Sequence, residues 1–451
     1  MACNDAAGEV SSLSSQRGSG ALHSREDPNW TADGWEQSGK TRELYPSSAG
    51  ERKARRLPKR IGLFGNFGIG NFGNDASLEA MILFLRRSRP DAEIVCVCPR
   101  PENVRENQKI SALPISVQRA SLWRKLANWI YAIVTVRKFE VMIIPGTGIL
   151  TDFCAPPFGM PYALFRWCLA ARICRTPIAF VSVGAGPIHH PLSRWFLKSA
   201  ASMAQYRSYR DAVSKNFMQS LGMNIASDTV CPDNVLNMPS SVTPSLQPRE
   251  STSITVGVGV MVFKGWDNVD PEVYDGYLGK ITEFVLWLLD NGYRVSLLLC
   301  DAADQQAIDD IRSVIEAERP ALQEQHFITE SALSVQDVIR QVSSADIIVA
   351  SRFHHLVFGL KYSKPTVSIG YDGKHDELMA SMGMGAFCQR IESLEVDRLI
   401  SQFKVLASER NRYEAIVRSA VISGQQRLSH QESVIASQFL GKAGLSAASA
   451  G

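Results

Sequence analysis

Residues Ile347–His355 read Ile-Ile-Val-Ala-Ser-Arg-Phe-His-His, and this stretch indicates both the fold and the chemistry of the chain. The segment 347–350 has the pattern of a strand in a parallel sheet, since uninterrupted apolar residues suit a strand covered on both faces. Arg352 and His354 follow at once, where a helix-like apolar stretch begins. Ligands gather at the mouth of a parallel sheet, and the next helix offers free N–H groups and a positive dipole end. An arginine at this point predicts an anion-binding site.

Working outward from this stretch, strand-like and helix-like segments alternate on both sides of a Ser-, Thr- and Pro-rich linker at residues 236–252. The strand-like segments are residues 61–64, 93–98, 140–144, 177–183, 254–262, 294–299 and 346–350, and the main helix-like segments are residues 75–89, 160–173, 271–290 and 334–344. Such alternation predicts right-handed crossovers and parallel sheets. We therefore expect an α/β fold with two doubly wound, Rossmann-like domains that face a cleft.

The domain bounds follow from composition. Residues 1–58 are rich in Ser, Gly and charge without periodicity, which predicts a disordered N-terminal extension. The expected parts after it are an N-terminal domain at 59–236, a C-terminal domain at 252–395, C-terminal helices at 396–440 and a flexible tail at 441–451. The helices are expected to pack back across both domains.

Composition excludes several classes of protein. A net charge of +3 on 451 residues, without zinc spacing or arginine-glycine repeats, argues against nucleic acid as a partner. The nine cysteines are scattered and form no repeated C-x-x-C pair, which is typical of reduced thiols in a cytoplasmic protein. The N-terminus lacks a secretory signal pattern, and no apolar run reaches the roughly 18 residues of a spanning helix.

Three glycine-bearing loops follow predicted strands of the first domain. The first, Gly65–Asp75, includes Asn71 and Gly73 and either makes a tight turn or binds an acceptor; no acidic residue closes the next strand, which disfavours a dinucleotide site. The second contains Gly148 and Asp152, and the Asp152 carboxylate would either bind sugar hydroxyls or cap a helix.

The third loop ends in His189 and His190, either of which would be a proton-transfer group or a solvated loop residue. Arg210 follows a further short strand and is a second candidate for binding an anion. Because these loops all leave the carboxyl edge of one predicted sheet, we expect them to converge on the cleft.

Together these motifs resemble the polysaccharide pyruvyl transferase family across nearly all of residues 60–395. The elements that carry the resemblance, in order, are Gly70-Asn-Phe-Gly-Asn-Asp75, Gly146-Thr-Gly-Ile-Leu-Thr-Asp152, Gly184-Ala-Gly-Pro187, Tyr209-Arg-Asp211, Ser351-Arg-Phe-His354 and Tyr371-Asp-Gly-Lys374. The element Cys231-Pro-Asp-Asn-Val235 only approximates the interdomain Asp-Pro element of that family. The resemblance implies a two-domain fold similar to GT-B glycosyltransferases.

The resemblance also implies an activity, the transfer of pyruvate from phosphoenolpyruvate to two hydroxyls of one sugar, with a ketal as product. The acceptor would be a sugar in a glycan or a lipid-linked oligosaccharide. Carried over by motif, Arg210, Arg352 and His354 are the expected donor-site residues, with His354 as the catalytic group. The expected substrate-binding residues are Asn71, Gly73, Gly148, Asp152, His189, His190, Tyr371 and Lys374.

These residue types suit that chemistry. Arginine binds carboxylate and phosphate through a planar fork, histidine moves protons near neutral pH, and Lys374 offers a phosphate contact. We expect no cofactor and no metal, because the sequence holds no obvious carboxylate cluster. The alternatives are a sugar-nucleotide glycosyltransferase on the same fold and a non-catalytic glycan-assembly protein.

Residues 122–137 form an apolar, aromatic segment with basic ends that includes Trp123 and Trp129. The pattern fits either a packed domain helix or an amphipathic helix that holds the protein at the inner face of a membrane. The sequence therefore leaves two possibilities open for this segment, a peripheral membrane contact and packing within the domain.

Overall fold

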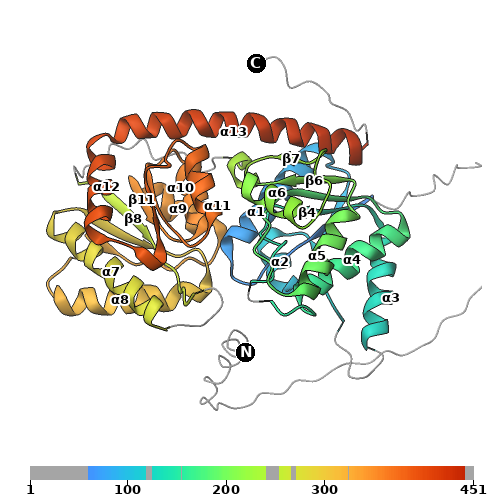
Figure 1. Ribbon diagram of the computed structural model, residues 1–451, viewed down its shortest axis with the longest axis horizontal. Helices are drawn as coiled ribbons and strands as arrows, with labels where there is room; N and C mark the ends of the chain where they lie inside the picture. Colours follow the sequence, from blue (N-terminus) through green and yellow to red (C-terminus); the bar gives the residue numbers. More distant parts are fainter. Residues whose placement is uncertain are drawn as a thin grey trace, which may run out of the picture. The chain divides into compact units, whose positions relative to one another are not determined.

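The computed structural model describes residues 59–117, 124–153, 155–239, 253–265, 271–323 and 325–441. The predicted N-terminal extension, residues 240–252 of the predicted linker and residues 442–451 of the predicted tail lie outside these described residues. The described residues belong to one compact unit that contains two separate parallel sheets (Figure 1).

The first sheet has seven strands in the order β3-β2-β1-β4-β5-β6-β7, all parallel. Its strands are β1 (Arg60–Phe64), β2 (Glu93–Cys98), β3 (Ser111–Pro114), β4 (Phe139–Pro145), β5 (Ile178–Val183), β6 (Tyr206–Tyr209) and β7 (Thr229–Val230). The helices between them are α1 (Phe72–Ser88), α2 (Pro101–Gln108), α3 (Arg124–Val136), α4 (Met160–Cys174), α5 (Pro191–Ser202) and α6 (Ala212–Ser220).

The second sheet repeats this topology with six parallel strands in the order β10-β9-β8-β11-β12-β13. Its strands are β8 (Thr255–Gly259), β9 (Arg294–Leu298), β10 (Phe327–Ile328), β11 (Ile347–Ala350), β12 (Thr366–Gly370) and β13 (Cys388–Arg390). Its α-helices are α7 (Pro271–Asp290), α8 (Gln305–Glu318), α9 (Val335–Ser344), α10 (Phe353–Lys361) and α11 (Gly373–Ser381). Short 3₁₀ turns lie at η1 (Asn234–Asn237), η2 (Ala302–Asp304) and η3 (Ile391–Ser393).

Both sheets reverse strand order beside their first strand, between β1 and β4 and between β8 and β11. Open α/β sheets bind ligands outside the carboxyl ends of the strands at such switch points. The predicted α/β class with two doubly wound sheets is confirmed. The strand at 347–350 is β11, which is fully buried and lies at the switch point of the second sheet.

The two halves share a packed interior. Phe72 and Ala76 at the start of α1 belong to the same apolar cluster as the second sheet. At the junction, the Phe72 N–H donates to the Cys300 carbonyl at 3.0 Å, and the Ala302 N–H donates to the Gly70 carbonyl at 3.0 Å. This pairing holds the glycine-asparagine loop of the first half against the loop after β9 of the second.

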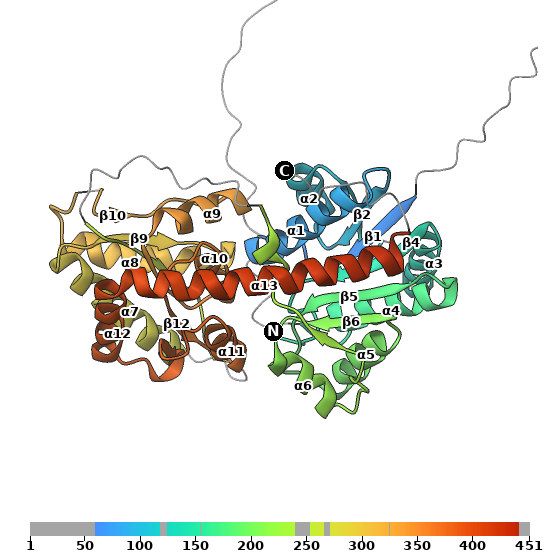
Figure 2. The same ribbon diagram turned by 90° about the horizontal axis from the view of Figure 1, so that it is seen from above.

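Helices α12 (Val396–Ser408) and α13 (Arg410–Phe439) follow the second sheet, and α13 runs along both halves (Figure 2). Its residues Val417 and Leu428 pack into the cluster of the second sheet, while Ile435 packs into a cluster of the first. Among the described residues, no helix combines the length and apolar character needed to cross a bilayer.

Candidate active site

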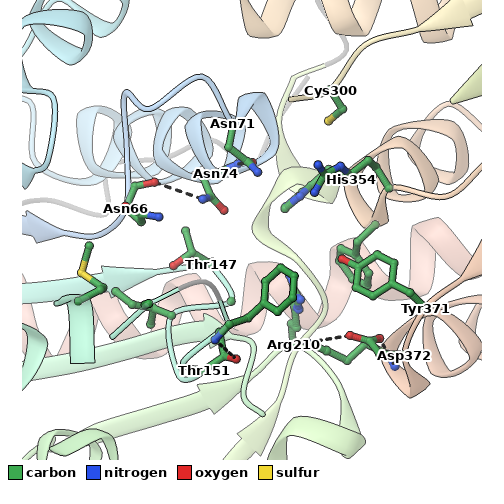
Figure 3. A pocket seen from close by; sticks show the side chains of 18 residues that line it. Asn66, Asn71, Asn74, Thr147, Thr151, Arg210, Cys300, His354, Tyr371 and Asp372 are labelled. Carbon is green, nitrogen blue, oxygen red and sulfur yellow. Dashed lines mark hydrogen bonds and ion pairs between the residues drawn. The ribbon is translucent and has the colours of Figure 1, made fainter. Parts of the chain in front are cut away.

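A cavity of about 230 Å³ lies at the carboxyl edges of both sheets, lined by loops from each half (Figure 3). The first half contributes side chains after β1, β4 and β6, and the second half contributes side chains after β9, β11 and β12. The lining residues are Asn66, Asn71, Asn74, Thr147, Gly148, Ile149, Thr151, Phe153, Ala155, Met160, Arg210, Cys300, Arg352, Phe353, His354, Tyr371, Asp372 and Lys374.

His354 occupies the first turn of α10 and turns its imidazole toward the first half of the chain. The ring packs against Gly73, where an added Cβ would lie only 2.1 Å from the His354 Cγ and Nδ1, so this position needs glycine. Burial lowers the pKa of His354 to about 3, and the positive charges of Arg210 and Arg352 add to the decrease. The imidazole is therefore neutral at pH 7 in the ligand-free site.

Asp233 faces His354 from the segment that follows β7. Its Oδ2 lies 3.7 Å from His354 Nε2, and its Oδ1 accepts a hydrogen bond from the Val235 N–H at 3.0 Å. Burial raises the pKa of Asp233 to about 6, against the lowering effects of Arg210 and of the Val235 N–H. A carboxylate and an imidazole that both titrate away from their usual pKa values thus lie side by side, which is typical of catalytic sites.

Arg210 follows β6 and is held mainly by stacking. Its guanidinium carbon lies 4.0 Å from the centroid of the Phe353 ring, and its ion pairs are long, 3.5 Å to Asp211 and 3.8 Å to Asp233. Gly184 makes room for the guanidinium, because a Cβ there would lie 2.8 Å from Nε. The fork is thus positioned by a ring and two distant carboxylates, which leaves donor directions for a ligand.

Arg352 occupies the N-cap position of α10, and its side chain pairs mainly with Asp304 and more distantly, at 3.9 Å, with Asp301. Its Nε and Nη2 each lie 2.6 Å from an oxygen of the fully buried Asp304. Burial alone would lower the pKa of Arg352, but the Asp304 and Asp301 carboxylates outweigh that effect and raise the pKa. One edge of this fork is occupied by Asp304, so only its remaining N–H groups are available to a ligand.

The segment after β12 supplies Tyr371, Asp372 and Lys374. Lys374 Nζ lies 3.0 Å from Asp372 and donates to the Gly186 carbonyl of the first half at 3.1 Å. Burial lowers the pKa of the Lys374 ammonium, although Asp372 opposes that decrease. Tyr371 stacks on Phe263, with ring centroids 5.6 Å apart. Lys374 therefore bridges the two halves at the rim of the cavity.

Three lining side chains carry a buried polar atom with no hydrogen-bond partner in the described part of the chain: Thr147 Oγ1, Arg210 Nε and His354 Nε2. Buried polar atoms in native proteins nearly always have a partner. Their convergence on one cavity indicates a site arranged for a polar ligand.

Asn71 has a structural role although it lines the cavity. Its side-chain oxygen accepts from the Asn74 N–H at the start of α1, and its side-chain nitrogen donates to Asp301 at 2.8 Å. Gly148 lines the cavity wall, and Gly73 contacts His354. The glycine-asparagine loop therefore joins the halves and supports the histidine.

Asp152, His189 and His190 do not line the cavity. The Asp152 carboxylate accepts hydrogen bonds from the backbone N–H groups of His189 and His190 at 3.0 and 2.9 Å. His190 Nδ1 in turn accepts from the Leu192 N–H and caps α5. Asp152 thus holds the loop that precedes α5, while His190, and not Asp152, occupies the N-cap position of that helix. The sugar contact of Asp152 and the proton transfer by these histidines remain predictions.

The sequence motifs do not identify Asp233, Asp304 or Phe353 as site residues. Phe353 stands between the two residues that were predicted, and Asp233 lies in the element that only approximates the Asp-Pro motif. That element directly follows a strand of the first sheet, and this position after a strand could have indicated Asp233 as a site residue. Asp304 carries no comparable signal, since it lies 48 residues before its partner.

The model of the family described as Polysaccharide pyruvyl transferase matches residues 71–373, more than half of the chain. The chain belongs to the polysaccharide pyruvyl transferase family. The matched range contains every lining residue of the cavity except Asn66 and Lys374. This result confirms the resemblance drawn from the motifs and makes the chain a member of a transferase family of polysaccharide biosynthesis.

One curated relative is the amylovoran biosynthesis protein AmsJ of Erwinia amylovora, with 20% identity over 405 residues that cover 80% of this chain and 95% of that protein. Among solved structures, the UDP-GlcNAc 2-epimerase of Neisseria meningitidis matches with a TM-score of 0.56 at 14% identity, covering 83% of this chain and 99% of its own. A glycosyltransferase of Rickettsia africae matches with a TM-score of 0.57 at 11% identity, covering 86% and 100%. These likenesses confirm the GT-B-like fold.

Proposed function

We propose that this protein transfers the pyruvyl group of phosphoenolpyruvate to two hydroxyls of one sugar in a glycan or lipid-linked oligosaccharide. The products are a cyclic ketal and phosphate. The observation that carries the proposal is the convergence of His354, Arg210, Arg352 and Lys374 on one cavity in a member of this family. We place the reaction in the cytoplasm, since the seven described cysteines are free thiols.

The charge of the cavity suits the donor. Phosphoenolpyruvate carries a carboxylate and a phosphate close together, and Arg210, Arg352 and Lys374 present positive charge from β6, β11 and β12. Arginine binds such groups through paired N–H donors. We assign Arg210 as the main clamp because its ion pairs are long, and Arg352 as a second contact whose position Asp304 holds.

The size of the cavity also favours a small donor. Its volume of about 230 Å³ is below the roughly 300–1,000 Å³ typical of sites that enclose drug-sized ligands. A nucleotide sugar is larger than that, whereas phosphoenolpyruvate is small. The cavity volume therefore agrees with a donor as small as phosphoenolpyruvate, and the donor assay below decides between this donor and a sugar nucleotide.

The reaction requires two proton transfers. One acceptor hydroxyl attacks C2 of the enol while the methylene C3 gains a proton and becomes a methyl group. The C2–O–phosphate bond then breaks, and the second hydroxyl attacks C2 to close the ring. Of the two hydroxyl protons, one ends on the methyl group and the other on the departing phosphate.

We assign His354 as the group that moves these protons. Because its pKa is near 3 without ligand, the neutral imidazole first accepts a hydroxyl proton. The bound donor brings negative charge next to Arg210 and Arg352, whose positive charges depress the pKa of His354, so donor binding raises that pKa. Asp233 positions the imidazole and stabilises its protonated form. Cys300 and Asn74 line the same cavity and have no assigned step.

The test is an incubation of the protein with phosphoenolpyruvate and a panel of glycans that contain mannose, galactose, glucose or glucuronate. The expected result is acceptor-dependent phosphate release and a product heavier than the acceptor by pyruvate less water. Turnover of nucleotide sugars without any dependence on phosphoenolpyruvate would instead support the glycosyltransferase alternative. No turnover of either donor with any acceptor would support the non-catalytic alternative.

A further inference from the structure

Helix α3 exposes an apolar stripe that nothing in the described structure covers. Leu126, Ile130 and Val134 are 51%, 53% and 48% exposed, and their i, i+4, i+8 spacing places them on one side of the helix. The opposite side is packed, since Ala132 and Val136 are fully buried in the core of the first sheet. The helix is thus both a packed domain helix and an amphipathic one.

Trp129 does not belong to this stripe. Its ring N–H donates to the Tyr162 hydroxyl of α4 at 3.1 Å, and the side chain is only partly exposed. Trp123 lies outside the described residues. The exposed aliphatic residues of α3, rather than Trp129, are therefore the groups offered to a partner.

The two neighbouring helices, α4 and α5, also carry or adjoin exposed apolar side chains. Helices α3, α4 and α5 pack in turn against the same core of the first sheet, and Figure 2 shows α3, α4 and α5 on one side of that sheet. Phe158, before α4, is 67% exposed, and Trp195 of α5 is 55% exposed. We name as the α3–α5 surface the six exposed residues Leu126, Ile130, Val134, Phe158, Ile173 and Trp195.

The charged residues of the three helices themselves have one sign. Helices α3, α4 and α5 contain no aspartate or glutamate. Exposed cations lie on these helices or directly after α3 and α4: Lys125, Arg137, Lys138, Arg172, Arg175 and Arg194. Among the described residues, none of these six forms an ion pair with a carboxylate. Exposed apolar side chains with cations beside them are the features of a helix that lies on an anionic bilayer.

A second copy of the chain fits this surface less well. A two-fold interface apposes the same patch from both copies, so the six cations would face one another. Anionic lipid headgroups instead complement the cations, while the apolar side chains and Trp195 reach the acyl boundary. We propose that the α3–α5 surface docks this protein on a bilayer that contains anionic lipid.

This surface adjoins a second cavity of about 980 Å³, lined by residues that include Phe158, Met160, Tyr162 and Arg166. Met160 lines both this cavity and the candidate active site, so the two cavities share one wall residue. A glycan carried on a membrane lipid would pass from the bilayer along Phe158 to Met160 and His354. This last step rests on the proposed function, whereas bilayer docking does not.

The experiment is vesicle flotation of the full chain without donor or acceptor, using phosphatidylcholine alone or mixed with phosphatidylglycerol. The wild type is expected to float with the anionic vesicles and to dissociate from them in high salt. Leu126→Asp/Ile130→Asp is expected to bind at least about tenfold more weakly, because two apolar side chains are lost from the contact. Arg137→Glu/Lys138→Glu is expected to bind the anionic vesicles at least about thirtyfold more weakly, because two cations are removed from the contact.

Matched controls exist on α13, away from this surface. Ile422 is 51% exposed and Arg418 is exposed, so Ile422→Asp and Arg418→Glu make one change of each kind elsewhere and are expected to bind as the wild type does. Circular dichroism checks that each variant is folded. Failure of the wild type to float, or equal flotation of Leu126→Asp/Ile130→Asp, overturns the proposal. Concentration-dependent dimerisation that this double variant abolishes, without vesicle binding, assigns the surface to a second copy instead.

Discussion

Oδ2 of Asp233 lies 3.7 Å from Nε2 of His354, so a buried carboxylate of the first half faces a buried imidazole of the second. Burial moves the two pKa values in opposite directions, up to about 6 for Asp233 and down to about 3 for His354. Both shifts favour the neutral form of a group that has lost its water. A bound anionic donor changes this balance, because it favours a protonated His354.

His354→Gln should lower phosphate release from phosphoenolpyruvate by about 10²–10⁴-fold in the presence of an acceptor, the usual size of a lost proton-transfer group. The check is to measure phosphate release by the variant and by the wild type under the same conditions. The matched control is His190→Gln, because His190 is exposed and lies outside the cavity, and its turnover should be unchanged. A His354→Gln variant that turns over as fast as wild type would exclude the assignment.

Asp233→Asn should lose activity and gain stability at pH 7. A carboxyl whose pKa is raised on folding stabilises the fold below its unfolded pKa, and that contribution is lost as the pH rises through about 6. Removing the ionised group should therefore raise the free energy of unfolding at pH 7 by roughly 1–3 kcal/mol, while Asn still accepts from the Val235 N–H. Denaturant unfolding at pH 7 and pH 4 checks this, and a variant less stable than wild type at pH 7 contradicts it.

The Asp233 carboxyl should also determine how turnover depends on pH. With Asp233 ionised above pH about 6, kcat/KM for phosphoenolpyruvate should fall as the pH drops below that value, because protonated Asp233 no longer stabilises the imidazolium. In the Asp233→Asn variant, kcat/KM should be low at every pH and should not fall further below pH about 6. An unchanged acid limb in the variant would assign the titration to another group.

The two arginines should respond differently to lysine. Arg352→Lys keeps the charge but loses the fork that contacts both oxygens of Asp304, so it should destabilise the protein by about 1–3 kcal/mol, the usual cost of an unsatisfied buried acceptor. Arg210→Lys breaks only long ion pairs, so it should raise KM for phosphoenolpyruvate with a smaller change in stability. Chemical denaturation and donor titration separate the two effects. Equal loss of stability in both variants would refute the distinction.

Much of the fold could be predicted from the sequence because its signals are local. The continuous apolar run at 347–350 and the apolar spacing within residues 75–89 each identify one element without reference to the rest of the chain. Arg352 and His354 were predictable as site residues for the same reason, since they directly follow a buried strand.

The other site residues depend on contacts between distant segments. Asp304 joins Arg352 across 48 residues, and Asp233 reaches His354 only because the two sheets face each other. Asp152 shows a different limit, because one carboxylate serves equally well as a helix cap or as a sugar ligand. In the structure this carboxylate instead accepts from the His189 and His190 N–H groups of the loop before α5, a contact between distant segments that the sequence does not reveal.

Gly73→Ala tests how closely the two halves must fit. An added Cβ would lie 2.1 Å from the His354 ring, a distance at which the ring or α1 must move. Because a displacement of about 1 Å in a catalytic group can cost on the order of 10²-fold in rate, phosphate release should fall by about that factor. Gly279→Ala is the matched control, since nothing lies within 4 Å of its added Cβ and it should keep full activity. Thermal unfolding of both variants checks that the fold survives. Full activity in Gly73→Ala would mean that His354 is free to move away from α1 during turnover.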